Sequence, residues 1–471
     1  MIFKKVQDLK KKRFENIIIG SGPAGISLAL SLEKEGVESL IIEAGNIDPY
    51  DGSNNLLDGK IINENYTSLE NARARQFGGS SNLWGGNCSI FSNHEIEKWG
   101  IEPLELYKFT NDAKKILNIS NDFYINQITN NLNHYKVIWS NVRFAEKYYS
   151  HINKSKKINL ILDTTFKYFE GNSKNIDYLV CQNKEVFKLS ARNYILACGG
   201  LENNRLMLHA REKNSKIFQN DLPIGFYYFD HPKKNIGKGI INKKKLLKFL
   251  ETKDSKIFPR IDCENLNFSL NSKYLETNNC LNSGLILKLK RNSPNLKIFK
   301  QAVCVAPDFI KKIYSDIKDK EIYEFDLSII QEQTASQLNN IKLSKRETDI
   351  FGIPRIELNW GLDENFNISR TKIIEEFSSF LIDHEIGRVA IQEDYYNNEN
   401  LTVGYHQMGG TRIGKNYSDS VIDKNLLVHG TNNLYICGSS TFRTAGISFP
   451  TFTVVLLSCR LGKHLILKNK V

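Results

Sequence analysis

The sequence has no apolar run that approaches the ~20 residues a membrane-spanning helix needs. Its first 13 residues, MIFKKVQDLKKKR, have neither the apolar core of a signal peptide nor the paired arginines of a Tat signal. Internal repeats and low-complexity linkers are also absent. These absences argue against a spanning, exported or repeat-built chain and predict cytoplasmic residence.

Cysteine occurs eight times but never as CxxC, and never beside histidine at metal-ligand spacing. Most of these residues stand in apolar runs, where a free thiol behaves as a small hydrophobe. We therefore expect reduced thiols and no metal at the positions Cys88, Cys181, Cys198, Cys263, Cys280, Cys304, Cys437 and Cys459.

Acidic residues are fewer than basic ones, 52 against 64, which gives a net charge of +12. No RNA- or DNA-binding signature accompanies the lysines, so nucleic acid is not an expected partner. The basic runs at 233–248 and 311–320 are interpreted as solvated faces, with a patch for an anionic substrate or lipid left open. A length of 471 residues with 41% hydrophobic and 25% charged content indicates a globular chain of two or three domains.

The most informative segment is 14–45, FENIIIGSGPAGISLALSLEKEGVESLIIEAG. It predicts a buried strand, a glycine turn, a helix and a second strand that ends in an acid. Gly20 suits the tight turn, Gly22 lets backbone approach a pyrophosphate, and Gly25 allows close helix–strand packing. Glu43 follows Gly20 by 23 residues, where an acid can accept hydrogen bonds from an adenosine ribose. This favours an NAD or FAD site over NADP and over a merely structural turn.

Further glycine-rich motifs follow this fingerprint. Residues 73–86, RARQFGGSSNLWGG, form a loop whose exposed N–H groups could bind a second phosphate or the polar edge of a flavin. Residues 194–208 read as a strand, a glycine turn and the start of a helix. Residues 404–412, GYHQMGGTR, place a histidine among glycines. Alone, such a histidine is more often structural than catalytic.

Apolar spacing predicts the regular elements around these motifs. Residues 158–200 alternate short apolar runs with polar turns and end in a buried strand at Tyr194–Ala197. Alternation predicts a strand at Gly284–Lys290, helical spacing predicts a helix at Arg370–Ile386, and a last helix is expected at Thr453–Leu467.

In this order, the motifs resemble those of the glucose–methanol–choline (GMC) oxidoreductases, which are FAD-dependent alcohol dehydrogenases and oxidases. The resemblance extends over nearly the whole chain and includes the segments Asp230–Pro232 and Gln337–Leu343. The form RxRxFGGSSNxWGG is most similar to the branch that acts on sugars and polyols, including pyranose oxidases.

The resemblance implies an α/β (overall α+β) fold: a Rossmann-like FAD-binding domain with an inserted substrate domain built on an antiparallel sheet. The implied boundaries give a discontinuous FAD-binding domain at 14–95, 155–235 and 398–471. A connecting or lid segment is expected at 96–154 and a substrate-binding domain at 236–397. It also implies the FAD-binding residues Gly20, Gly22, Gly25, Glu43, Arg75, Gly79, Ser80, Asn82, Trp84, Gly438, Ser439, Pro450 and Thr451. In pyranose oxidases, the residue before the loop tryptophan is a histidine that bonds FAD; here it is Leu83, so non-covalent FAD is expected.

By the same resemblance, His406 is the catalytic base that takes the hydroxyl proton while hydride passes to flavin N5. His231 is expected to be a packing or capping residue, and His429 to close a turn. The family places a second histidine or asparagine before the Pro-Thr pair, where this chain has Phe449. Ser448 could serve instead if the register shifted, so both residues are candidate substrate contacts.

The predicted function is FAD-dependent oxidation of a CH–OH group of a sugar, polyol or glycoside. The electron acceptor is not identified by the sequence. Oxidation of a larger apolar alcohol is an alternative that Phe449 would permit. A flavin-retaining protein without turnover is another, since Phe449 offers no hydrogen bond to a substrate.

Overall fold

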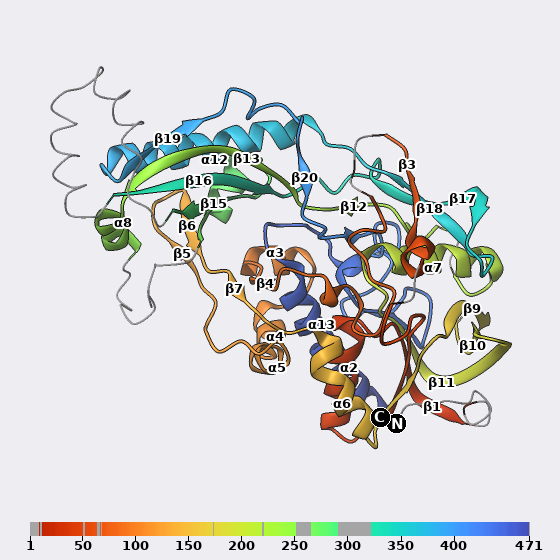
Figure 1. Ribbon diagram of the computed structural model, residues 1–471. Coiled ribbons are helices and arrows are strands. Elements are labelled where there is room, and N and C mark those ends of the chain that lie inside the picture. The colour runs from red at the N-terminus through yellow and green to blue at the C-terminus, as the bar shows by residue number, and fades with distance from the viewer. Residues whose placement is uncertain are drawn as a thin grey trace.

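A computed structural model describes residues 9, 12–49, 52–63, 66, 68–172, 174–218, 221–250, 265–290 and 322–470. Cys263, Cys304 and the basic run at 311–320 lie outside these residues, as does most of the basic N-terminal segment. In the described part of the chain, the strands form two large sheets and several small ones (Figure 1).

The first large sheet has a parallel core in the order β8–β2–β1–β11, and β22 pairs with the carboxyl end of β11. An antiparallel pair, β10 and β9, extends the amino end of β11. The chain order reverses between β1 and β11, which is where doubly wound sheets bind ligands. The bounds are β1 Arg13–Ile19, β2 Ser39–Ile42, β8 Ile158–Ile161, β9 Thr165–Gly171, β10 Ile176–Gln182, β11 Val186–Leu196 and β22 Leu434–Ile436. The strand predicted at Tyr194–Ala197 is the end of the longer β11.

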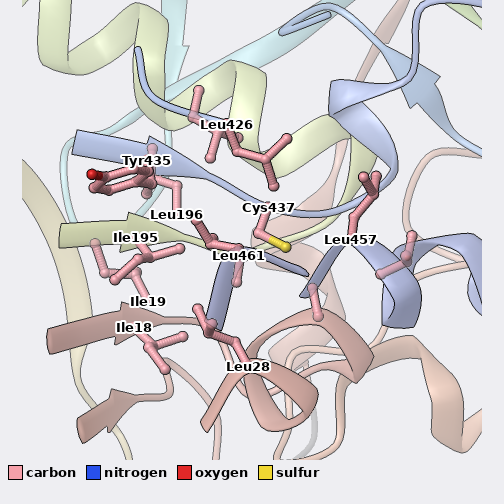
Figure 2. Packing of buried hydrophobic residues seen from close by; sticks show 14 of the residues in the cluster. Ile18, Ile19, Leu28, Ile195, Leu196, Leu426, Tyr435, Cys437, Leu457 and Leu461 are labelled. Carbon is pink, nitrogen blue, oxygen red and sulfur yellow. The ribbon is translucent and has the colours of Figure 1, made fainter. Parts of the chain in front are cut away.

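Helices α2 (Pro23–Lys34) and α13 (Pro450–Lys470) lie side by side against this sheet (Figure 1). They approach closely because Gly462 has no side chain: a Cβ there would lie 2.5 Å from Ser31 Oγ. Figure 2 shows Leu28 of α2 and Leu461 of α13 in one apolar cluster with Ile18 of β1. Burial of such side chains is the main stabilising term of this layer. The last helix begins at Pro450, not at the predicted Thr453, and runs on past Leu467.

The second large sheet is antiparallel and has the order β19–β13–β16–β15–β14–β6–β5, with β20 paired to β13. Its bounds are β5 Ile125–Gln127, β6 Leu132–Tyr135, β13 Pro232–Asn242, β14 Leu266–Leu270, β15 Ser283–Leu289, β16 Ile322–Gln331, β19 Gly387–Ile391 and β20 Thr402–Val403. Helix α12 (Glu364–Asp383) packs on one face through Phe377 and Phe380 (Figure 1). It begins six residues before the predicted Arg370 because Asp363 accepts a hydrogen bond from the Phe366 N–H.

The remaining elements are small sheets and further helices. The small sheets contain β3 Gly59–Ile61 with β17 Asn340–Thr348 and β18 Pro354–Asn359; β4 Asn87–Cys88 with β7 Ile138–Trp139; and β12 Tyr228–Phe229 with β21 Met408–Gly409. The other helices are η1 Ser53–Leu57, η2 Gly79–Asn82, α3 Asn93–Lys98, α4 Pro103–Tyr107, α5 Thr110–Ile116, α6 Phe144–Lys154, α7 Gly200–Lys213, α8 Lys243–Leu250, α9 Ser272–Thr277 and η5 Ser439–Thr441.

The predicted fold class is confirmed: a Rossmann-like parallel layer is combined with a large antiparallel sheet. The domain boundaries stay a prediction. Two strands from the expected connecting segment, β5 and β6, pair into the second sheet. Within the described ranges, no helix combines the length and the apolar character needed to cross a membrane. These ranges also hold no cluster of histidine, cysteine or acidic side chains suited to a metal ion.

Candidate functional site

A cavity of about 660 Å³ opens at the carboxyl ends of β1, β2 and β11. Helices α2, α7 and α13 begin at its wall, through Gly22, Gly199 and Phe449 with their neighbours. The first N–H groups of a helix have no partner inside the helix, and they form its positive dipole end. Convergence of such ends makes the cavity suitable for an anionic, phosphate-containing ligand.

The three fingerprint glycines have the local geometry that the sequence predicted. Gly20 has φ +104°, and a Cβ on Gly25 would lie 2.0 Å from the Gly20 carbonyl oxygen. Gly25 therefore packs inside the turn and does not line the cavity. Gly22 is different: it lines the cavity, and no atom lies within 4 Å of the Cβ position. Backbone at Gly22 is thus open to a ligand.

Glu43 lies at the end of β2 and lines the same cavity. One carboxylate oxygen accepts hydrogen bonds from the Ser21 N–H at 3.0 Å and the Ser21 hydroxyl at 2.6 Å. The other accepts from the Gly45 N–H at 2.8 Å. Burial raises the pKa of this carboxyl, and the Ser21 and Gly45 bonds oppose that shift. Glu43 therefore braces the turn as well as facing the cavity.

The loop at 73–86 folds back onto the fingerprint turn. A Cβ on Gly79 would lie 3.0 Å from Gly22 Cα, so the two glycine segments are in contact. Arg75 donates to Thr165 Oγ1 at 2.9 Å, and the Trp84 ring N–H donates to Val142 O at 2.9 Å. The predicted loop residues that line the cavity are Arg75, Gly79, Ser80 and Trp84. Asn82 is not among them: its amide donates to Phe77 O at 2.8 Å.

The C-terminal motifs also line the cavity, through Gly438, Ser439, Pro450 and Thr451. The Ser439 hydroxyl donates to Gln407 O at 2.6 Å. The sequence interpretation did not select Gln407, yet this residue lines the cavity, and its buried Nε2 has no hydrogen-bond partner. A buried amide without a partner is costly, so a bound ligand would stabilise it. Only the proximity of Gln407 to His406 could have suggested this residue.

His406 is partly buried and also lines the cavity. Its Nδ1 lies 2.7 Å from Nδ1 of His231, and its backbone N–H donates to Asp230 Oδ1 at 2.8 Å. Burial lowers the pKa of His406 well below its usual value, and His231 and Lys233 lower it further. The imidazole is therefore neutral near pH 7 and able to accept a proton.

Phe449 packs against His406, with ring centroids 5.1 Å apart at 76°. Ser448 points elsewhere: its hydroxyl donates to Ile90 O at 2.6 Å, and it lines a second cavity of about 270 Å³. In the large cavity, the residue that contacts the His406 ring is thus the apolar Phe449 and not Ser448. His429 contacts Ser420, with Nε2 3.0 Å from its hydroxyl.

Comparison with known proteins finds two matching family models and several relatives. Residues 335–458 match the family model described as GMC oxidoreductase, and residues 13–52 match an FAD binding domain. A stretch of 160 residues is 28% identical to the fructose dehydrogenase large subunit of Gluconobacter japonicus. Another of 133 residues is 28% identical to 2-methyl-1,2-propanediol dehydrogenase of Mycolicibacterium austroafricanum. These stretches cover 33% and 27% of this chain, but only 28% and 23% of the relatives.

Solved structures share the fold over nearly the full length. Pyridoxine 4-oxidase from Mesorbium loti superimposes with a TM-score of 0.61 at 13% identity, covering 96% of this chain and 99% of that one. A formate oxidase gives 0.59 at 14% identity, covering 98% and 99%. The chain thus carries a match to the GMC oxidoreductase model at residues 335–458 and to an FAD binding domain at residues 13–52, and the solved structures add the shared fold. Its cofactor is FAD, as the sequence predicted.

Proposed function

We propose that this protein oxidises a CH–OH group of a sugar, polyol or glycoside, with His406 as the catalytic base. The observation that supports this most directly is that His406 and the glycine turn of the FAD fingerprint line one cavity. The relatives named as a fructose dehydrogenase and a diol dehydrogenase agree with such a donor.

The residues of the cavity fit FAD. Gly22 is open to a close backbone approach, helix N-termini converge, and Gln407 presents a donor without a partner. Gly20, Gly22 and Glu43 would hold the ADP half, with Gly25 supporting the turn from within. Arg75, Gly79, Ser80 and Trp84, with Asn82 bracing their loop, would hold the central part, and Gly438, Ser439, Pro450 and Thr451 would contact the ring system.

In the reaction, His406 Nε2 accepts the hydroxyl proton of the alcohol as the C–H bond breaks. When bound, FAD would supply the acceptor for the hydride, so that the alcohol would lose two electrons and become a carbonyl compound. Phe449 packs edge-to-face with the His406 ring and would limit the access of water beside it. Without a second hydrogen-bonding group at position 449, His406 alone would handle the hydroxyl.

The lining of the cavity includes Lys233 and Asn267, which suit a hydroxyl-rich donor. The lining also includes Ile286 and Ile330, which with Phe449 favour the second candidate, a larger apolar alcohol. A Phe449→Asn variant separates the two: rates with sugars should rise and rates with long alkanols should fall. The opposite change would support the apolar donor.

The test of the function is anaerobic mixing of holoenzyme with fructose, xylitol, 2-methyl-1,2-propanediol and 1-octanol, following flavin absorbance near ~450 nm. At least one alcohol should bleach the flavin. His406→Ala should slow that step by ~10²–10⁴-fold, whereas His151→Gln, at an exposed histidine of α6, should not. Absence of bleaching with every alcohol would favour a flavoprotein without turnover, and full-rate bleaching by His406→Ala would remove His406 as the base.

We further propose that FAD is held without a covalent bond, since Leu83 is an exposed alkyl side chain. Acid precipitation should then release the yellow cofactor into the supernatant, and colour in the pellet would contradict this. Cytoplasmic residence is part of the proposal, and the six described cysteines, all free, agree with a reducing compartment. The electron acceptor is unidentified.

A further inference from the structure

The histidine predicted to be a packing or capping residue, His231, makes a direct contact with His406. The two Nδ1 atoms are 2.7 Å apart, and the rings are nearly perpendicular at 89°. These residues are 175 positions apart in the chain. A contact this short between two ring nitrogens requires that one of them bears the proton and the other does not.

Backbone pairing on both sides holds the two histidines together. Before His231, Phe229 of β12 pairs with Met408 of β21. After it, Pro232 of β13 pairs with Val403 of β20, and His231 O accepts from the Gly404 N–H at 2.7 Å. The contact is therefore built into two strand ladders and does not depend on side-chain packing alone.

Asp230 reinforces the same arrangement from behind. Its Oδ1 accepts the backbone N–H of His231 at 2.7 Å and that of His406 at 2.8 Å, and its Oδ2 accepts the Tyr66 hydroxyl. Burial raises the pKa of Asp230 to about 6, and these three bonds oppose the shift. At pH 7 and above, the carboxylate thus fixes both histidine backbones.

The carbonyl of Ala445 decides which nitrogen of His231 bears the proton. This oxygen lies 3.0 Å from His231 Nε2, and a carbonyl can only accept. Nε2 must therefore be protonated. His231 is fully buried, and burial lowers its pKa to about 4, so the ring is neutral at ordinary pH. A neutral ring protonated at Nε2 has a bare Nδ1, and that atom faces His406.

It follows that the proton between the rings belongs to His406 Nδ1. A neutral His406 protonated at Nδ1 has its lone pair at Nε2, and Nε2 has no hydrogen-bond partner among the described residues. Gly404 preserves this geometry, since a Cβ there would lie 3.1 Å from His406 Nδ1.

We propose that His231 is a positioning residue that holds His406 in its Nδ1–H tautomer, so that Nε2 is the atom that takes the hydroxyl proton. This rests on the proposed function of His406. No new bond or electron transfer is involved: Ala445 O orients His231, and His231 orients His406. A similar division of roles operates wherever a hydrogen-bonded partner fixes the tautomer of a catalytic imidazole.

Two amide substitutions separate the two bonds of His231. In His231→Asn, the amide oxygen can replace Nδ1 as the acceptor toward His406, while the bond to Ala445 is lost. In His231→Gln, the amide N–H can replace Nε2 toward Ala445, while the acceptor toward His406 is lost. With the alcohol identified by the bleaching assay, flavin reduction should stay within ~10-fold of the parent for Asn. For Gln it should fall ~10-fold or more, up to the ~10²–10⁴-fold expected for loss of a base.

A double-variant cycle tests whether His231 acts through His406. His231→Gln should slow flavin reduction in the parent but not in the His406→Ala background, because the residue it orients is then absent. Bound FAD should be equal in the single and double variants. Equal slowing in both backgrounds, or a parental rate for His231→Gln, would overturn the proposal.

A readout independent of turnover is the tautomer itself. In protein labelled with ¹⁵N-histidine, the signals lost in His406→Ala identify the two nitrogens of that ring. We expect a protonated Nδ1 and a bare Nε2 near pH 7.5. A protonated Nε2 would overturn the proposal even if His406 is the base, whereas failure of every alcohol to bleach the flavin would count against the function alone.

Discussion

Replacing Gly22 by alanine separates cofactor binding from folding. The residue has φ −73° and ψ −174°, an extended conformation that alanine adopts freely. No atom of the protein lies within 4 Å of the added Cβ. Apoprotein stability should therefore change little, with an upper limit of ~1 kcal/mol from the altered helix cap. The methyl group would instead enter the cavity, at the place where the backbone of Gly22 is proposed to contact FAD.

The expected loss of affinity follows from overpacking, which costs about 1–3 kcal/mol. A cost of ~2.7 kcal/mol corresponds to a ~100-fold higher Kd. At FAD concentrations of about 100 times the parental Kd, bound FAD stabilises the parent by ~2.7 kcal/mol. The same concentration would stabilise Gly22→Ala by only ~0.4 kcal/mol.

The assay is titration of apoprotein with FAD, followed by flavin fluorescence, together with urea unfolding with and without FAD. Gly25→Ala is the matched control: its Cβ would lie 2.0 Å from the Gly20 carbonyl oxygen, so the apoprotein itself should be destabilised. Parental FAD affinity in Gly22→Ala would refute the assignment of this turn to the cofactor.

Two further changes test electrostatics and burial. Burial, His231 and Lys233 all lower the pKa of His406. Lys233→Met should therefore move the acid limb of the pH profile of flavin reduction toward higher pH. An acid limb at the parental pH would show that Lys233 does not influence His406. His209 is buried, and neither of its ring nitrogens has a hydrogen-bond partner among the residues that the structure describes. Because a buried polar group without a partner is costly, His209→Leu should stabilise the protein by ~1–3 kcal/mol. Burial lowers the pKa of His209 to about 4 in the native protein. As pH falls from 6.5, this histidine is therefore protonated in the unfolded chain but stays neutral in the native one, and the parent protein loses stability. The gain in urea midpoint should thus be larger at pH 5 than at pH 8, and an equal gain at both would contradict this.

Much of the fold could be predicted because its signals are local. The turn from Gly20 to Gly25 depends on φ values and contacts within a few residues, and those are visible in the spacing of the glycines. Helix limits were harder to predict: α12 begins earlier than its apolar spacing indicated, because the cap at Asp363 lies outside the periodic stretch.

The candidate site could be predicted only in part. His406 was selected because its motif resembles that of a known family, but nothing local indicates that it contacts His231. The direction of Ser448 was equally hidden, since its hydroxyl bonds to Ile90 O, 358 residues earlier in the chain. Side-chain direction at such points is decided by which distant strands and loops pack together.

The sequence by itself determined the cofactor class, the glycine turns and the choice of His406 as the candidate base, because short-range sterics and motif order specify them. Only the tertiary structure decided the partner of that histidine. Two strand ladders bring His231 to 2.7 Å from His406, and the Ala445 carbonyl then dictates where the protons lie. Hydrogen bonds between groups so far apart in the chain exist only after the sheets have formed, so no local sequence pattern predicts them.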